Sequence, residues 1–324
     1  MRALICLAIV AAFGAVRKGL GMTATTGNRT LAAAGAILGY AVLIGFTDNF
    51  VRSIAEEGGL WQFHALRSAM AAAMFGLAAL PLSLRLRPVN LRSLAARSVI
   101  HAVAMLVYFG SLAFLTVAQT AAGLFTAPIF VLLLSRFLFG HPLGPVRIAA
   151  VALGFVGVLL VLQPGSQSPL GWASLVPVVA GAFYALGNLA TREWCAQESA
   201  AAMTLGFFVA LGLAGAIGLG VLALWAPAVP AGADGFILRG WVWPSNSFLF
   251  WTFVQALGSM IAVGLMVKGY QLADASRVSI FEYVILPVSA GWSWILWGQT
   301  IPPLAAVGMA LIVAAGAMIA LRGR

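Results

Sequence analysis

Long apolar stretches alternate with short polar ones along most of this chain. Most of these stretches approach the roughly 20 apolar residues that a helix needs to cross a lipid bilayer. The pattern therefore predicts an all-α integral membrane protein with ten transmembrane helices. The predicted spans are residues 31–53, 60–81, 97–116, 119–138, 145–163, 170–191, 202–225, 247–267, 276–297 and 302–321.

The apolar stretch nearest the N-terminus, residues 3–16, is too short to cross a bilayer. Arg17 and Lys18 follow it directly, and no convincing signal-peptide cleavage site is present. We therefore expect residues 1–30 to form an N-terminal leader that is cytoplasmic or lies at the membrane surface.

The composition agrees with a membrane protein and excludes several other classes. Hydrophobic residues make up 62% of the chain and charged residues only 8%. The net charge of +10 does not indicate nucleic-acid binding, because the basic residues lie between the apolar spans. Cys6 and Cys195 stand in unrelated contexts, so neither a disulfide framework nor a metal site is expected. The expected partners are membrane lipid and a small-molecule substrate, with no cofactor.

Basic residues are distributed unevenly between the two sides of the predicted membrane. Fifteen of the 18 Lys and Arg residues lie on the side that holds the N-terminus, and two, Arg52 and Arg239, lie on the other. Cytoplasmic loops are enriched in Lys and Arg, so both termini are predicted to be cytoplasmic, in a bacterial inner membrane. The fifteen residues are Arg2, Arg17, Lys18, Arg29, Arg85, Arg87, Arg92, Arg97, Arg136, Arg147, Arg192, Lys268, Arg277, Arg322 and Arg324.

Two segments of the chain repeat one another at a constant spacing. Gly110 and Pro128 recur as Gly269 and Pro287, both 159 positions later. The repeat divides the ten predicted spans into two sets of five. Because five is odd, the second set would enter the membrane in the opposite orientation. The sequence thus predicts the inverted-topology repeat that secondary transporters use for alternating access.

The first predicted five-helix repeat covers residues 31–163, and the second covers residues 164–324. The difference in spacing between the halves is absorbed mainly by a long outer loop at 226–246, which contains three prolines. The leader, residues 1–30, stands outside both repeats.

Two further patterns occupy corresponding parts of the halves. They are Leu-Ala…Pro-x-x…Phe-Gly-His141 and Tyr270-Gln-Leu-Ala…Phe-Glu-Tyr283…Pro287…Trp297-Gly298-Gln299, with weaker support from Arg67-Ser-Ala. On these patterns the chain resembles EamA domains of the drug/metabolite transporter superfamily over residues 31–321. The resemblance implies a transporter, and exporters of aromatic amino acids and of methyl viologen are among its relatives.

The chain departs from the EamA pattern at two helix ends and in the second span. His141 and Gln299 stand where members of the family usually have glutamate, and the proline often found just before Arg67 is missing. Because the two missing glutamates belong to helix ends, we expect their replacement to alter gating or packing more than transport itself.

Asp48 and Glu282 are the only carboxylates well inside predicted spans. Arg67 lies about as deep as Asp48, and at about 1.5 Å per residue both stand roughly 10 Å below the outer boundary. One hypothesis is a fixed ion pair or outer gate formed by Asp48 and Arg67, which would relieve the cost of burying either charge. The other is that they contact the substrate.

Glu282 lies beside a predicted interruption of its helix. Pro287 cannot donate a hydrogen bond to the carbonyl of Tyr283, so a free acceptor is expected close to the carboxyl group. We predict that Pro128 and Pro287 break or kink their helices near the midplane. An ionisable residue at such a place is a candidate for proton coupling or for binding a substrate amine. The alternative is a neutral carboxyl group that donates to a backbone carbonyl.

The remaining candidates are polar or aromatic residues near the midplane of the predicted spans. Tyr184 and Asn188 are four residues apart and therefore share one face of a helix. Trp292 is expected either to line an outer vestibule or to pack toward lipid, and His64 and His101 are expected to be packed or interfacial. The further candidates are Tyr108, Gln255, Ser259 and Tyr283.

These observations predict a secondary transporter that exports small metabolites, with amino acids or related amphipathic amines as the substrate class implied by the resemblance. Coupling to protons is a further hypothesis, and the chain is expected to be a monomer or homodimer. Alternatives are a carrier of a nucleoside or cofactor precursor, a channel or scaffold, and a membrane-embedded enzyme acting on lipid through Asp48, His64 and Glu282. The sequence contains no nucleotide-binding loop and none of the common hydrolase motifs, so no enzyme activity is predicted.

Overall fold

The computed structural model describes residues 26–115, 117–163 and 171–322, and within these ranges all regular secondary structure is helical. Three short 3-10 segments accompany the α-helices: η1 (Trp172–Leu175), η2 (Gly232–Gly235) and η3 (Glu282–Val284). The α-helices are α2 (Thr26–Asp48), α3 (Val51–Glu57), α4 (Leu60–Ala79), α5 (Leu91–Ser111), α6 (Val117–Leu124), α7 (Ala127–Phe137), α8 (Pro145–Leu162), α9 (Val176–Glu193), α10 (Ala200–Trp225), α11 (Asn246–Leu272), α12 (Ala275–Phe281), α13 (Ile285–Trp297) and α14 (Pro303–Arg322).

Among the described residues, nine helical stretches are long and apolar enough to cross a membrane. They correspond to nine of the ten predicted spans. The predicted span 60–81 forms the 20-residue helix α4, which is not one of the nine. This helix carries Gln62, His64 and Arg67 in its first half, and these polar residues lower its hydropathy.

The boundaries of α2 and α5 differ from the prediction. Residues 1–25 of the predicted leader lie outside the described residues, and α2 already begins at Thr26. Helix α5 begins at Leu91, six residues before the predicted span. The side chain of Asn90 accepts hydrogen bonds from the first turn of α5, and the Glu198 carboxylate accepts from the backbone N–H of Asn90 at 2.6 Å. These capping contacts, rather than hydropathy, fix the start of α5.

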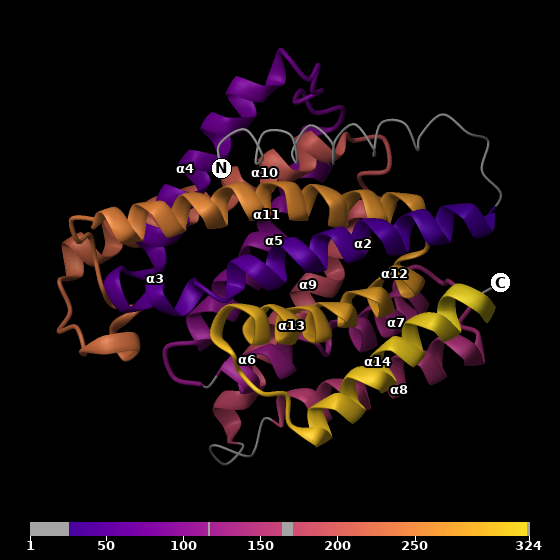
Figure 1. Ribbon diagram of the computed structural model, residues 1–324. Helices are drawn as coiled ribbons and strands as arrows, with labels where there is room; N and C mark the ends of the chain where they lie inside the picture. Colours follow the sequence, from indigo (N-terminus) through magenta and orange to yellow (C-terminus); the bar gives the residue numbers. More distant parts are fainter. Residues whose placement is uncertain (1–25, 116, 164–170, 323–324) are drawn as a thin grey trace.

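The chain passes repeatedly between two ends of a helical bundle (Figure 1). We call one the α3 end, on the left in Figure 1, where α3 and the connection between α10 and α11 lie. The other is the Asp274 end, where α12 begins. The predicted outer loop is this connection, residues 226–245. Its Arg239 donates hydrogen bonds to the carbonyls of Ala55 (3.0 Å) and Gly58 (2.8 Å), which attaches the connection to α3.

Helices from distant parts of the chain pack side by side. Helix α2 lies along α11, α4 along α10, α5 along α9, and α8 along α14 (Figure 1). Glycine makes the last of these contacts possible. A Cβ atom at Gly157 of α8 would lie only 2.6 Å from the carbonyl oxygen of Gly308 of α14. Close backbone approach at small residues is typical of helix packing in lipid.

Two membrane stretches are interrupted near their middle. The stretch 117–137 divides into α6 and α7, with Pro128 in the first turn of α7. The stretch 275–297 divides into α12, η3 and α13, with Pro287 in the first turn of α13. Proline suits the first turn of a helix because its missing N–H has no partner there. The second interruption places Glu282 in the interior of the bundle.

Candidate functional site

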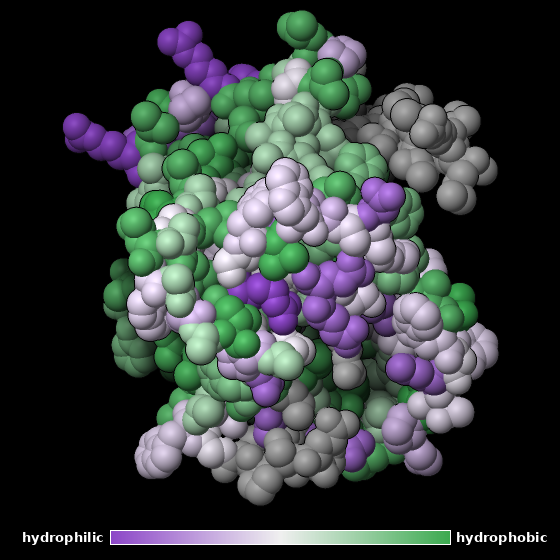
Figure 2. All heavy atoms as spheres, turned by 90° about the vertical axis from the view of Figure 1, so that its left-hand side faces the viewer, coloured by the Kyte–Doolittle hydropathy of each residue, from purple (hydrophilic) through white to green (hydrophobic). Residues whose placement is uncertain are grey.

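A central cavity of about 300 Å³ reaches from Arg97 and His101, inside the bundle, to Asn49 and Leu162 at the α3 end. This volume is at the lower limit of the roughly 300–1,000 Å³ usual for ligand pockets. Figure 2 looks onto the α3 end, where hydrophilic residues gather near the middle of the face. The predicted site residues in the cavity wall are Asp48, Arg67, Tyr108, Pro128, Tyr184, Gln255, Ser259 and Glu282.

The Glu282 carboxyl group is surrounded by tyrosines. It is 4% exposed, and the hydroxyl of Tyr184 donates a hydrogen bond to its Oε1 at 3.2 Å. Tyr270, whose side chain is fully buried, lies close to this carboxyl group. Around them, the Tyr184 hydroxyl lies 3.4 Å from that of Tyr40 and 2.8 Å from the sulfur of Met266. We call Tyr40, Tyr184 and Tyr270 the tyrosine cage. These neutral groups stabilise a carboxylate without cancelling its charge.

The helical interruption explains why Glu282 has this position. It is the first residue of η3, between α12 and α13, and the tighter 3-10 turn shifts the direction of the side chains that follow. Helix α2 supplies Tyr40, α9 supplies Tyr184 and α11 supplies Tyr270, so the cage depends on contacts between three helices.

Asn188 supports the tyrosine cage from behind. It is fully buried and absent from the cavity wall, and its side-chain amide donates to the Tyr270 hydroxyl at 3.0 Å. Tyr184 and Asn188 therefore act on the same cluster, one in the cavity wall and one through Tyr270. Asn188, predicted to be a site residue, therefore does not contact the cavity directly in this structure.

Tyr283 points away from the cavity. It is fully buried, and a Cβ atom at Gly154 of α8 would lie 2.5 Å from its ring. Its hydroxyl oxygen is buried without a hydrogen-bond partner among the described residues. Tyr283 therefore does not line the central cavity in this structure. Neighbouring residues in a helical turn face different directions, and Glu282 takes the side that faces the cavity.

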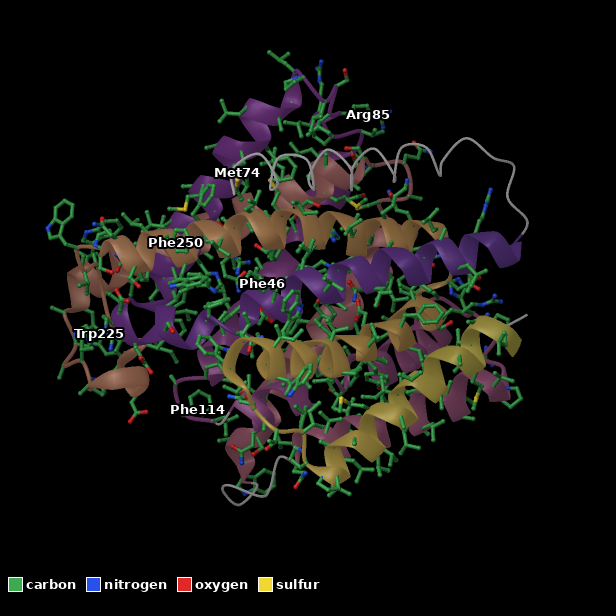
Figure 3. All side chains as sticks on the ribbon, in the orientation of Figure 1. Phe46, Met74, Arg85, Phe114, Trp225 and Phe250 are labelled. Atoms are coloured by element: carbon green, nitrogen blue, oxygen red, sulfur yellow. The ribbon has the colours of Figure 1, made fainter. Side chains whose placement is uncertain are left out.

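Trp292 is also absent from the cavity wall. Its indole nitrogen donates to the carbonyl of Val42 at 3.0 Å, and its ring meets that of Phe46 edge-on with centroids 5.1 Å apart. Phe46 belongs to α2, and its ring contacts Trp292 of α13 (Figure 3). Trp292 thus joins these two helices instead of lining a vestibule. Pro287 is likewise outside the wall, whereas Pro128 is part of it.

Asp48 and Arg67 both line the cavity, but no ion pair joins them in the described part of the chain. The amide of Gln255 donates to Asp48 Oδ1 at 3.0 Å. Arg67 instead lies near the rings of Phe63 and Phe208. The two side chains are therefore not ion-paired in this structure. Gln255 comes from α11, and no local pattern of residues indicates that it would reach Asp48 on α2.

Several residues of the wall were not among the predicted site residues. Arg97 had been placed at the cytoplasmic boundary, but it is fully buried in α5. Its guanidinium donates to the Thr191 hydroxyl at 2.9 Å and to the Met203 carbonyl at 3.0 Å. His101, which was expected to be packed or interfacial, lies one turn further on and also lines the cavity. A basic residue at the edge of an apolar run was the only sequence signal for Arg97.

The residues proposed for an enzyme do not meet. Asp48 and Glu282 line the cavity, but His64 does not. His64 is fully buried beside the rings of Phe63 and Phe109. A search of the described residues also finds no group of three potential metal ligands.

A second polar region lies at the opposite end of the bundle. The Asp274 carboxylate forms ion pairs with Arg147 (3.2 Å), Arg192 (3.0 Å) and Arg277 (3.4 Å). We call these four residues the Asp274 cluster. Three of them, all except Arg277, line a cavity of about 530 Å³. The same cavity wall contains His141, one of the departures from the EamA pattern; its Nε2 lies 3.7 Å from Glu193.

The described helices and the central cavity define a multi-pass membrane protein with a polar site in its interior. Residues 30–163 match the model of the EamA-like transporter family. The resemblance to the drug/metabolite transporter superfamily is thereby confirmed.

Two relatives and one solved structure extend the comparison. The chain is 28% identical to a riboflavin transporter of Rhizobium johnstonii over 223 residues, which are 69% of this chain and 68% of the relative. It is 24% identical to the pseudopaline exporter CntI of Pseudomonas aeruginosa over 280 residues, 85% of this chain and 92% of the relative. A crystal structure with 19% identity superposes with a TM-score of 0.71, covering 92% of this chain and 99% of the other, which supports the fold.

Proposed function

We propose that this protein is a secondary transporter that moves a small metabolite through the central cavity by alternating access. The observation that carries the proposal is the cavity itself, which holds two carboxylates and two arginines in the interior of an apolar bundle. Ionisable residues inside a membrane protein are costly and mark substrate or ion pathways. The transporters among its relatives support the same class of function.

The proposed architecture has ten spans in two inverted five-helix repeats, residues 31–163 and 164–324. Helix α4 supplies the tenth span in spite of its polar residues, because these face the cavity and its neighbours rather than lipid. The interruptions near Pro128 and Pro287, one in each half, support the repeat. The distribution of basic residues supports cytoplasmic termini in a bacterial inner membrane.

The proposed substrate is an amphipathic amine or amino acid with an aromatic part, and the proposed direction is export. The carboxyl group of Glu282 and the hydroxyls of its tyrosine cage offer a site for an ammonium group, or for a proton that couples transport to a gradient. The named exporter among the relatives supports this direction. A cofactor precursor with a flat ring system is the second candidate, because two-thirds of the chain is similar to a riboflavin transporter.

Counterflow in proteoliposomes tests transport directly. Vesicles loaded with unlabelled tryptophan, tyramine or riboflavin are diluted into the labelled compound, and accumulation is followed. We expect accumulation of one of the first two compounds, and accumulation of riboflavin alone would select the second candidate. Empty vesicles provide the background. If none of these compounds accumulates, and none of a wider metabolite panel does, the chain is not a carrier of the proposed kind.

The orientation has its own test. In a cysteine-free background, a single cysteine at Asp234 should react with an impermeant reagent added to intact cells, and one at Asn90 should not. Both side chains are exposed, at the α3 end and the Asp274 end respectively. Cys195 is 1% exposed and is therefore unsuitable as a reporter. Labelling at Asn90 would contradict cytoplasmic termini.

A further inference from the structure

The Arg67 side chain is held in the wall of the central cavity by aromatic rings. It extends from α4 and is only 3% exposed. Its guanidinium carbon lies 5.3 Å from the centroid of Phe63, 5.8 Å from that of Phe109 and 5.4 Å from that of Phe208. Rings at these distances attract a cation through their faces. The three rings therefore fix the position of the positive charge.

The rings leave the Nε donor of Arg67 unused. A guanidinium carries five N–H donors, which point outward in its plane. In Arg67, Nε is buried without a hydrogen-bond partner among the described residues. Arg97, the other arginine of the cavity wall, differs in this respect. It donates to Thr191 and to the carbonyl of Met203. The position of Arg67 is thus fixed by the rings, but its Nε donor has no hydrogen-bond partner among the described residues.

The charge of Arg67 also has no counter-ion in direct contact. Asp48 lines the same cavity, but it accepts from Gln255 and forms no ion pair with Arg67 in the described structure. His64, one turn earlier on α4, brings no negative charge. A buried charge without a partner is unfavourable. Ionisable residues inside membrane proteins mark substrate or ion pathways, so a ligand is a candidate for the missing partner.

We propose that Arg67 is an anion-binding subsite of the central cavity and that the transported molecule carries a carboxylate there. A carboxylate matches the planar edge of a guanidinium with two parallel hydrogen bonds. A phosphate monoester is disfavoured because its second negative charge would be repelled by Asp48 in the same wall. The inference rests on the proposed function, since it takes the central cavity to be the substrate site.

This subsite limits the class of substrate. Glu282 and its tyrosine cage lie in the same cavity wall as Arg67 and suit a hydrogen-bond donor or cation. A molecule that satisfies both regions is bipolar, with a carboxylate at one position and a donor group at another. An amine without an acidic group, or a neutral ring system, satisfies only one of them.

Binding of small aromatic probes tests the subsite without knowledge of the substrate. Benzoate, benzamide and phenyl phosphate are titrated into the purified protein by calorimetry at several ionic strengths. The neutral benzamide has the size and ring of benzoate but lacks its charge. We expect benzoate to bind roughly 10- to 100-fold more tightly than benzamide, the range for charge-assisted hydrogen bonds.

Variants of arginine identify the residue responsible. In Arg67→Gln the preference for benzoate should fall to about one, and in Arg87→Gln, which removes an exposed arginine outside the cavity, it should stay unchanged. Arg67→Lys keeps the charge and should retain a reduced preference. Arg67→Lys also tests the subsite if Arg67→Gln does not fold. If Arg67 had only a structural role, Arg67→Lys would keep the wild-type preference for benzoate over benzamide.

Three results would overturn the subsite. They are wild-type binding of benzamide as tight as that of benzoate, no measurable binding of benzoate, and an unchanged preference in Arg67→Gln. Tighter binding of phenyl phosphate than of benzoate would refute the carboxylate. These outcomes are separate from the transport test. If a substrate shows counterflow but the protein has no preference for benzoate over benzamide, only the proposed subsite is contradicted. If the protein prefers benzoate but no compound shows counterflow, only the proposed transport is contradicted.

Discussion

The central cavity, inside the bundle, and the Asp274 cluster, at one of its ends, both contain charged residues, but they pair these charges differently. In the cluster, Asp274 contacts three arginines, so opposite charges meet directly. In the cavity, Glu282 accepts from the Tyr184 hydroxyl and Asp48 accepts from the Gln255 amide. Each cavity carboxylate has a neutral partner.

This difference indicates different roles for the two regions. Ion pairs between α8, α9 and α12 hold those helices together at the Asp274 end, and would have to separate for that end to open. Neutral hydrogen bonds orient a carboxylate but leave its charge available to a ligand or proton. Substitutions in the cavity should therefore change transport more than stability, and substitutions in the Asp274 cluster should do the reverse.

The largest expected effect follows replacement of Glu282 by Gln, which keeps the size and one acceptor but removes the charge. If Glu282 binds a substrate amine, affinity should fall by about 1.5–3 kcal/mol, the worth of a charge-assisted hydrogen bond. If it carries the coupling proton, net transport should lose its pH dependence while binding persists. Both are measured in proteoliposomes at several external pH values.

The control for this variant is Glu57→Gln, at an exposed carboxylate of the α3 end. It should leave both properties unchanged. Unaltered affinity together with an unaltered pH profile in Glu282→Gln would reduce Glu282 to a structural acid and remove the contrast between the two regions.

A smaller effect, and one on stability, is expected for Asp274→Asn. The side chain of Asp274 is 42% exposed, so water screens its three ion pairs, and we expect a loss of about 1–2 kcal/mol rather than that of a fully buried network. Thermal unfolding in detergent measures this. Asp234→Asn, at an exposed acid of the outer connection, should change the unfolding midpoint little. Equal midpoints for the two variants would show that the cluster does not hold the helices.

The smallest expected effect distinguishes Tyr184, in the cavity wall, from Tyr283, which lies outside it. Tyr184→Phe removes the hydroxyl that donates to Glu282 and should cost about 0.5–1.5 kcal/mol, together with a change in the pH profile of transport. Tyr283→Phe removes a buried hydroxyl without a partner and should be neutral or slightly stabilising. Unfolding curves of both variants measure this difference in stability. A greater loss of stability in Tyr283→Phe than in Tyr184→Phe would contradict the placement of Tyr184 in the cavity wall and of Tyr283 outside it.

The sequence predicted the helices well because lipid makes one simple demand on each of them. A run of apolar residues needs its backbone groups satisfied internally, and only a helix achieves this for a single span. The two interrupted stretches also follow from local chemistry, since proline lacks an N–H group. The start of α5 did not follow, because Asn90 and Glu198 fix it through hydrogen bonds that hydropathy does not report.

The site was predicted less completely because it depends on which helices are neighbours. Glu282 and Tyr184 could be selected as unusual residues of apolar spans, and the structure brings them together. Tyr40 had no such signal, since a tyrosine in a span is more often a packed ring, and Tyr270 stood out only as part of the pattern shared with EamA domains. The orientation of Asp48 toward Gln255 follows from the packing of α2 along α11, and no local pattern in either helix indicates it.

The glycine contact between α8 and α14 has a consequence for how the protein is made. Helix α8 ends at Leu162, and α14, its main neighbour, begins at Pro303 near the end of the chain. At the roughly 5–20 residues per second of translation, α8 waits on the order of ten seconds in the membrane before α14 emerges. During that time its glycine face is open to lipid or to an insertion chaperone. A ribosome that stalls before residue 303 therefore leaves a nascent chain in which α8 has no α14 to pack against.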